Sequence, residues 1–238
     1  MRTQRYTLVL ALLSLTFTKA QDFQIPWQIT EQKQGVSVTV VNKVGEDPVF
    51  QKKQELLEKA FKEAADAYIK ALTSADHPIN KAIGPFRRPT ALRILSGMEI
   101  TVMMLEKDDP QDHPMTWRLP TMFQGGDAFV TKIPYKFLEN GKVYIRFEHL
   151  ALHEIAHIVA GTLDKTLDSE DLSELEIQRR VEYLVYLMVG EKKYKEFIYQ
   201  LYVDEHPKAS DQSAKLTVEK WMKLMGVEKD PFQLDIGG

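Results

Sequence analysis

The sequence has 238 residues and no cysteine. Disulfide bridges, thiolate metal ligands, a cysteine nucleophile and lipid attachment at an amino-terminal cysteine are therefore excluded. The lack of disulfides does not argue against export, because a chain of this length can bury a core large enough to fold without cross-links.

Positive charge is not concentrated anywhere in the chain, whose formal net charge is −3. A mildly acidic protein without a basic patch is poorly suited to bind nucleic acid or anionic lipid, so we expect neither partner. Hydrophobic residues make up 44% of the chain and charged residues 27%, which is ordinary for a globular protein.

Long apolar runs are scarce as well. The run at the amino terminus, Thr7–Phe17, has 11 residues, too few for the roughly 20 that span a bilayer. It follows Arg2 and Arg5 and precedes small residues, which is the pattern of a secretory signal peptide. We expect residues 1–20 to be a signal peptide and residues 21–238 a single domain. The mature protein would be secreted or periplasmic, without stable insertion in a membrane.

Periodicity and turn residues predict an α+β domain. A β-branched run predicts a strand at Val36–Val44, and Asp47 as a cap predicts a helix from Pro48 to about Thr73. The remaining predictions are strands at Leu92–Leu95, Glu99–Leu105, Ala128–Ile133 and Val143–Phe147, helices at Glu148–Ala160, Ser169–Val189, Lys192–Val203 and Thr217–Met225, and loops at His77–Thr90 and Lys107–Gly126. This order places the sheet early and makes the second half helical.

The segment His153-Glu154-Ile155-Ala156-His157 has the form HExxH. Because two histidines four residues apart lie on one face of a helix, both imidazoles can reach the same metal ion. The glutamate between them stands where it can take a proton from water that the ion activates. We predict a zinc site with His153 and His157 as ligands and Glu154 as the general base.

A third histidine, His149, precedes His153 by four residues. His149 and His157 are eight residues apart, which is roughly 12 Å along a helix, whereas zinc–nitrogen bonds are about 2.0–2.1 Å long. One ion cannot bind both, so the third ligand must come from another segment.

Through the HExxH motif, the chain resembles the zincin metallopeptidases over roughly Val36–Val189. The resemblance implies a zincin-like fold with a small mixed sheet, a backing helix and an active-site helix. The longer metzincin motif is not matched, because Gly161 and Asp164 each come one position late. Gly161–Asp164 (GTLD) matches the letters of the aspzincin GTxD element, although it follows His157 closely, and this makes Asp164 a candidate ligand.

Gluzincins instead take a glutamate from the following helix, where Glu174, Glu176 and Glu182 are available. Glu182 lies in an apolar stripe that is expected to pack on the motif helix, where a carboxylate needs a strong partner such as a metal. We therefore prefer Glu182 as the third ligand. The alternative for Glu182 is a buried salt bridge to one of the two arginines before it. Glu176 has a spacing that some gluzincins use, but it can also form a capping box with Ser173.

The resemblance further implies hydrolysis of peptide bonds, with peptides or proteins as substrates and Zn²⁺ as the cofactor. We expect the strand Ala128–Ile133 to form the edge of the cleft and pair with an extended substrate, with Gly125-Gly126 allowing close backbone approach. The candidates for stabilising the transition state are His206, Tyr183, Tyr186 and Arg179.

Two other functions are consistent with the same residues. The chain could be an exported zinc-binding or interaction domain without activity, or a zinc amidase that acts on cell-wall material. Replacing Glu154 with glutamine separates an enzyme from a binding domain, and a substrate screen separates the two hydrolases. The sequence does not indicate an oligomeric state.

Overall fold

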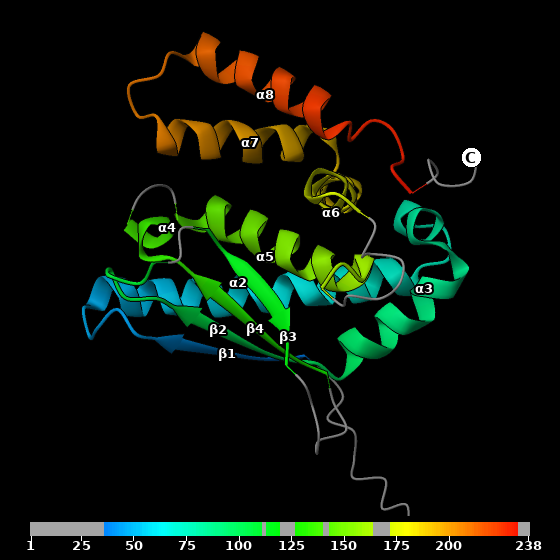
Figure 1. The fold of residues 1–238 in the computed structure, drawn as a ribbon, viewed down its shortest axis with the longest axis horizontal. Helices are drawn as coiled ribbons and strands as arrows, with labels where there is room; N and C mark the ends of the chain where they lie inside the picture. Colours follow the sequence, from blue (N-terminus) through cyan, green and yellow to red (C-terminus); the bar gives the residue numbers. More distant parts are fainter. Residues whose placement is uncertain (1–35, 111–112, 120–126, 140–142, 164–171, 233–238) are drawn as a thin grey trace, which may run out of the picture. The chain divides into compact units, whose positions relative to one another are not determined.

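The computed structural model of the chain describes residues 36–110, 113–119, 127–139, 143–163 and 172–232 (Figure 1). These residues form a small four-stranded sheet and seven helices, so the expected α+β class is confirmed. The predicted signal peptide and Gly125-Gly126 lie outside the described residues. No described helix is both long and apolar enough to cross a membrane.

The sheet is mixed, with the strand order β1-β2-β4-β3. Strands β1 (Ser37–Asn42), β2 (Glu99–Met104) and β4 (Ala128–Ile133) are parallel, and β3 (Met115–Arg118) runs antiparallel to β4. The prediction that Ala128–Ile133 forms the cleft edge is therefore wrong, because β4 is an inner strand. The edge belongs to β3, which lies in a segment predicted to be a loop. Its four residues are too few to show a clear alternation among the surrounding prolines and aspartates.

Helix α2 (Pro48–Thr73) has the predicted bounds, because its start signal is local. The Asp47 side chain accepts a hydrogen bond from the Val49 N–H, and Pro48 occupies the first turn, where its missing N–H costs nothing. The helix buries Phe61 and Tyr68 completely. It packs on β1 and on α5, the helix that carries the motif.

Helix α3 (Pro78–Ser96) replaces one predicted loop and one predicted strand, Leu92–Leu95. The prolines suggested a loop, but Pro78 and Pro85 each stand where a helical segment starts. Pro78 follows the cap His77, and Pro85 follows a kink at Gly84, whose φ is 75°.

Val143–Phe147, predicted to be a strand, is the beginning of α5 (Val143–Ala160). A short apolar run does not by itself distinguish a strand from a buried helix. In this chain the burial of Phe147, Leu150, Ala151 and Ile155 follows helical spacing.

The second half is helical, as expected: α4 (Tyr135–Glu139) and α5 are followed by α6 (Glu174–Val189), α7 (Glu191–Glu205) and α8 (Asp211–Met225). Helix α6 begins five residues later than predicted. Its start is set by a capping box, in which the Ser173 hydroxyl accepts from the Glu176 N–H and the Glu176 carboxylate accepts from the Ser173 N–H.

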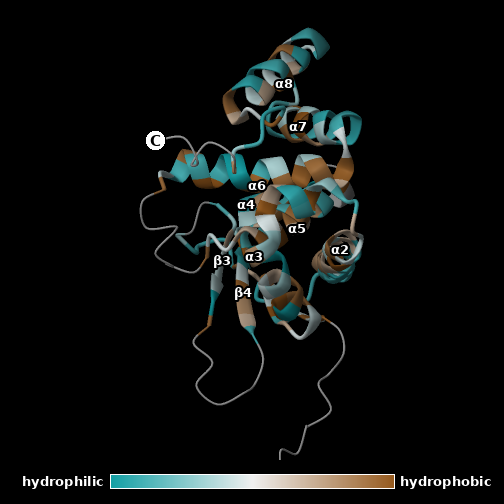
Figure 2. Cartoon of the chain, turned by 90° about the vertical axis from the view of Figure 1, so that its right-hand side faces the viewer, coloured by the Kyte–Doolittle hydropathy of each residue, from teal (hydrophilic) through white to brown (hydrophobic). Residues whose placement is uncertain are grey.

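Helix α5 lies between two layers. In Figures 1 and 2, which are views at right angles, the sheet lies on one side of α5, and α7 and α8 lie on the other. Figure 2 shows that α5 is largely hydrophobic, in keeping with this central position. The motif residues are therefore enclosed by the sheet and the carboxy-terminal helices.

Candidate metal centre

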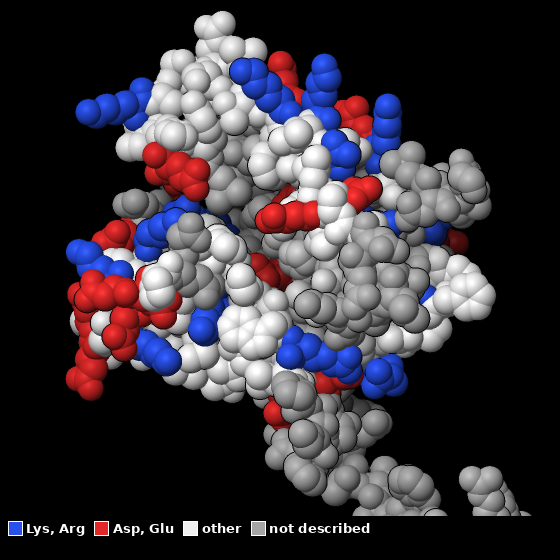
Figure 3. Space-filling view, viewed as in Figure 1, with Lys and Arg blue, Asp and Glu red and all other residues white. Residues whose placement is uncertain are grey.

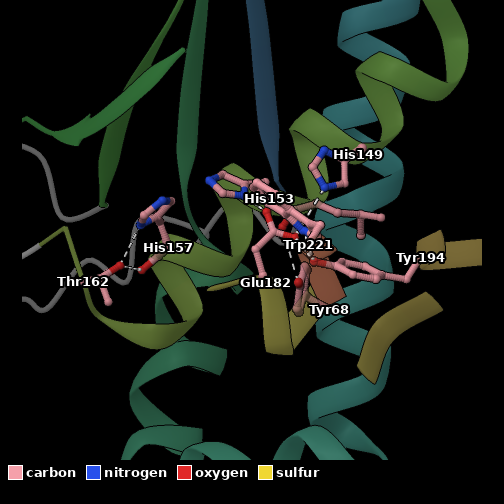
Figure 4. Close-up of polar contacts among 9 residues, drawn as sticks. Tyr68, His149, His153, His157, Thr162, Glu182, Tyr194 and Trp221 are labelled. Atoms are coloured by element: carbon pink, nitrogen blue, oxygen red, sulfur yellow. Dashed lines mark hydrogen bonds and ion pairs between the residues drawn. The ribbon is translucent and has the colours of Figure 1, made fainter. Parts of the chain in front are cut away.

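Helix α5 carries three histidines on successive turns of one face (Figure 4). The ring centroids of His149 and His153 are 6.0 Å apart, and those of His153 and His157 are 5.0 Å apart. The same helix is tied to its backing helix, since the buried Tyr68 hydroxyl donates to the Leu152 carbonyl at 3.3 Å. The two motif rings are thus neighbours on a helix that is fixed from behind.

The end of α5 fixes the turn that carries His157. Gly161 has φ of 77° and its N–H donates to the His157 carbonyl at 3.0 Å, a geometry that favours glycine after a helix. Arg87 from α3 donates to the carbonyls of Ile158 and Val159 at 2.8 and 2.9 Å. Its positive charge also complements the negative end of the helix.

The Nδ1 atom of His157 lies 2.8 Å from the Thr162 hydroxyl. That hydroxyl donates its proton to the His157 carbonyl at 3.3 Å, so its oxygen accepts from Nδ1–H of the ring. Burial, together with the charge of His153, lowers the pKa of His157 to about 3, so the ring is neutral at physiological pH. A neutral ring protonated on Nδ1 carries its free lone pair on Nε2.

The Nδ1 atom of His153 lies 2.8 Å from Oε1 of Glu182, which comes from α6. Burial opposes the charged ring, but the hydrogen bond and charge of Glu182 outweigh it and raise the pKa of His153. Because an ionised carboxylate only accepts, the Nδ1–H of His153 donates to it. Both motif histidines therefore have Nδ1 engaged with an oxygen of the chain, and Nε2 is left as the other ring nitrogen.

Glu182 is only 2% exposed, and its carboxylate has partners on both oxygens. The Tyr194 hydroxyl donates to Oε2 at 2.6 Å, and the Nε2 atom of His149 lies 3.6 Å from the same oxygen, beyond hydrogen-bond distance. Burial alone would raise the pKa of Glu182, but His149 and His153 hold it well below its usual range. Glu182 is therefore ionised, and its partners are not the arginines before it, Arg179 and Arg180.

Glu154 is also buried, at 3% exposure. Burial raises its pKa, and the charge of His153 and a hydrogen bond from the Thr116 hydroxyl offset only part of this shift. Thr116 lies on the edge strand β3 and shares a hydrogen bond with Thr131 of β4 at 2.6 Å. The edge strand therefore lies near the carboxyl group between the two motif histidines.

A cavity of about 470 Å³ opens beside His153, Glu154 and Glu182, and His157 is not among its lining residues. Its polar lining includes His113, His149, His153, Glu154, Glu182 and Glu205, and its apolar lining includes Phe137, Leu150, Ile198, Leu201 and Trp221. Figure 3 shows acidic side chains inside a recess in this view of the surface. The glutamates that line the cavity favour a cation, and its apolar side chains favour a larger ligand.

These residues fit a metal ion in part. Metal-binding histidines usually donate their second ring N–H to a carboxylate or another oxygen, and His153 and His157 have this arrangement. Among the described residues, no group of three or more His, Cys, Asp or Glu side chains is assembled around one point. Glu182 faces the Nδ1 side of His153, so its carboxylate would have to turn to reach an ion bound at Nε2.

The other candidate ligands and stabilisers are placed differently. Glu176 is in the capping box and Glu174 is exposed in the first turn of α6, whereas Asp164 lies outside the described residues. None of the predicted transition-state stabilisers lines the cavity. Arg179 donates to the Leu224 carbonyl and Tyr183 packs on Phe232. Tyr186 packs on Tyr194, the partner of Glu182, and His206 packs on Tyr202, which lines the cavity.

Five residues near the site are not predicted from the sequence: His113, Thr116, Thr162, Tyr194 and Trp221. Tyr194 stands at helical spacing from Phe197 and Ile198, a pattern that by itself indicates packing. Thr162 could have been found, because a hydroxyl just after a helix-ending glycine can reach back to the last turn. The others belong to distant segments, and no local pattern points to them.

Comparisons with protein-family models, with curated proteins and with solved structures give no match to this chain.

Proposed function

We infer that the protein is an exported zinc-dependent metallopeptidase, with His153 and His157 as metal ligands and Glu154 as the general base. One observation carries this proposal: the Nδ1–H of each motif imidazole donates a hydrogen bond to a side-chain oxygen, at 2.8 Å in both cases. This arrangement favours metal binding through the two Nε2 atoms, because second-shell oxygens of this kind set the tautomer and orient the ring.

A bound zinc ion would supply Lewis-acid activation of water and polarise the scissile carbonyl. Glu154 would take a proton from the attacking water and then give it to the leaving amine. Its raised pKa supports this role, because a carboxyl group that must both accept and return a proton works best with a pKa nearer the working pH.

Glu182 is our candidate for the third ligand. It is the ionised carboxylate that α6 brings to His153, and its exposed fraction of 2% excludes most competing solvent. Whether it binds the ion or only orients His153, its negative charge favours a cation in the cavity.

A peptide is the substrate class that the surroundings favour. Within the described part of the chain, β3 pairs only with β4, so its other side can accept an extended peptide as an added strand. Thr116 on β3 lies near Glu154 and lowers the pKa of its carboxyl group, so a peptide held there would run past the general base. The apolar wall formed by Ile198, Leu201 and Trp221 could receive a hydrophobic side chain of that peptide.

The test combines metal content with a peptide-cleavage screen. We expect the purified mature chain to bind about one zinc per molecule and to cleave a mixture of peptides, with activity lost in a chelator and restored by zinc. The Glu154→Gln variant should bind zinc like the wild type and lose at least about 10³-fold in activity, because it removes a general base and leaves the ligands.

The matched control is Glu148→Gln, a half-buried glutamate on α5 that pairs with Lys193. This variant should keep full activity. A wild-type chain that takes up no zinc would refute the metal site. If the zinc-loaded chain is inactive on peptides but releases small amines from cell-wall fragments, the protein is an amidase and the peptidase proposal is wrong.

A further inference from the structure

The carboxy-terminal pair of helices, α7 and α8, extends a chain of hydrogen bonds to the metal centre (Figure 4). The Trp221 indole on α8 donates to the Tyr194 hydroxyl on α7 at 3.0 Å. Tyr194 donates in turn to Oε2 of Glu182 at 2.6 Å, and Oε1 of Glu182 accepts from His153 at 2.8 Å. Four helices are therefore linked through one carboxylate.

The direction of every bond in this chain is fixed. An indole N–H can only donate, so the Tyr194 oxygen must accept from Trp221. The single Tyr194 proton is then available for Glu182, whose ionised carboxylate can only accept. Hydrogen bonds that are linked in one direction polarise one another, which strengthens the whole row of bonds in a buried site. Tyr194 is fully buried, so no bulk water competes for this contact.

Tyr194 also holds the carboxylate oxygen of Glu182 that faces His149. His149 lies 3.6 Å from the oxygen that Tyr194 holds, and the buried Nε2 atom of His149 has no hydrogen-bond partner among the described residues. Without the Tyr194 hydroxyl, Glu182 could turn toward His149 and would no longer be held in place against His153.

We propose that Tyr194 and Trp221 are positioning residues for the metal centre, which hold Glu182 against His153 and away from His149. The proposal rests on the proposed function for its metal and takes Glu182 in its orienting role, because a carboxylate that turns to bind the ion would leave His153. It extends the site to α7 and α8, which carry no predicted ligand and form the wall of the cavity opposite the sheet.

The test is zinc affinity, measured by competition with a chelator on the metal-free full chain. We expect Tyr194→Phe to bind zinc about 10–100-fold more weakly, the usual cost of losing an outer-shell partner, and Trp221→Phe to lose less. Tyr199→Phe is the matched control, because Tyr199 lies on the same helix and donates to a carboxylate, Asp211, at 2.9 Å. It should bind zinc like the wild type.

A double-mutant cycle separates positioning from general destabilisation. In a Glu182→Gln background, Tyr194→Phe should have little further effect on zinc affinity. An undiminished loss there, or wild-type affinity of a folded Tyr194→Phe single variant, would overturn the proposal. If Tyr194→Phe does not fold, Trp221→Phe takes its place in the cycle.

A second measurement does not need the metal. The Nδ1–H proton of His153 should give a hydrogen-bonded NMR signal in the metal-free wild type and Tyr199→Phe, and should shift or broaden in Tyr194→Phe. An unchanged signal in Tyr194→Phe contradicts the positioning role. A wild type that shows this signal but binds no zinc contradicts only the proposed function.

Discussion

The two motif histidines are held in opposite ways. The Nδ1 atom of His157 is paired with Thr162, five residues along the chain, whereas that of His153 is paired with Glu182, 29 residues away on another helix. The His157 end is therefore fixed by the local closure of α5, and the His153 end by packing among α5, α6, α7 and α8. One site thus combines a local half and a tertiary half, and the two halves should respond differently to mutation.

The largest effect is expected at the tertiary end. Glu182→Ala should lower the free energy of unfolding by about 3–5 kcal/mol in the presence of a chelator, because it leaves the buried His153 and Tyr194 groups without their partner. Urea unfolding measures the loss. The control is Glu174→Ala, an exposed glutamate in the first turn of the same helix, which should change stability little. A loss below about 1 kcal/mol for Glu182→Ala would contradict the buried hydrogen bonds of Glu182 with His153 and Tyr194.

Glu182→Gln also tells which role the carboxylate has toward zinc. If Glu182 only orients His153, affinity should fall about 10–100-fold. A substantially larger loss would identify it as a ligand that turns toward the ion.

The next effect is expected at the local end, in the residue that closes α5. A Cβ at Gly161 would lie 2.5 Å from the Arg87 guanidinium and would sit at a φ of 77°. Gly161→Ala should therefore cost about 2 kcal/mol, from backbone strain and displaced hydrogen bonds of Arg87. Gly226→Ala is the control for strain alone, since its φ is 61° and nothing lies within 4 Å of the added carbon. Equal losses in the two variants would show that Arg87 does not secure this end.

The same contrast explains what the sequence could and could not predict. The HExxH pair, the Asp47 cap and the Ser173 capping box are short-range patterns, so their placement needed no knowledge of the fold. Glu182 was a candidate because its helical stripe marked the face that packs on α5. Trp221 and Tyr194 could not be found, because their contacts with each other and with Glu182 span 27 and 12 residues and depend on how the helices pack.

The errors in the fold have a related cause. The prolines in α3 are typical of loops, although two of them open helical segments. The short apolar runs in α3 and α5 predict strands and helices equally well, because four or five residues fit either period. The edge strand β3 is defined by its pairing with β4, and a strand that depends on its neighbour leaves little trace in its own four residues.

A smaller effect is expected for Thr162, which tests whether the local half matters for the metal. Thr162→Val removes the acceptor of the His157 Nδ1–H and should weaken zinc binding about tenfold, or about 1.4 kcal/mol. Thr162→Ser keeps the hydroxyl and should restore most of the affinity. Should valine bind zinc as tightly as serine, the orientation of His157 would have to come from packing instead.

The smallest effect on stability is expected at His77, whose Nδ1 accepts a hydrogen bond instead of donating one. Its Nδ1 accepts from the Ile79 N–H at 3.3 Å and caps α3, whereas the motif rings donate from Nδ1. Burial lowers the pKa of His77 below its ordinary value of 6.5, so the unfolded chain binds this proton more readily. The stabilising contact is therefore present above about pH 6.5 and is lost as the pH falls below it.

His77→Asn keeps a capping side chain that does not titrate. The variant should match the wild type in urea unfolding at pH 7.5 and lose less stability than the wild type at pH 5, with a chelator present throughout. The difference between the two chains isolates His77 from the other histidines, which titrate in both. Equal losses on acidification would show that the contact between His77 and the Ile79 N–H adds nothing to the stability of α3.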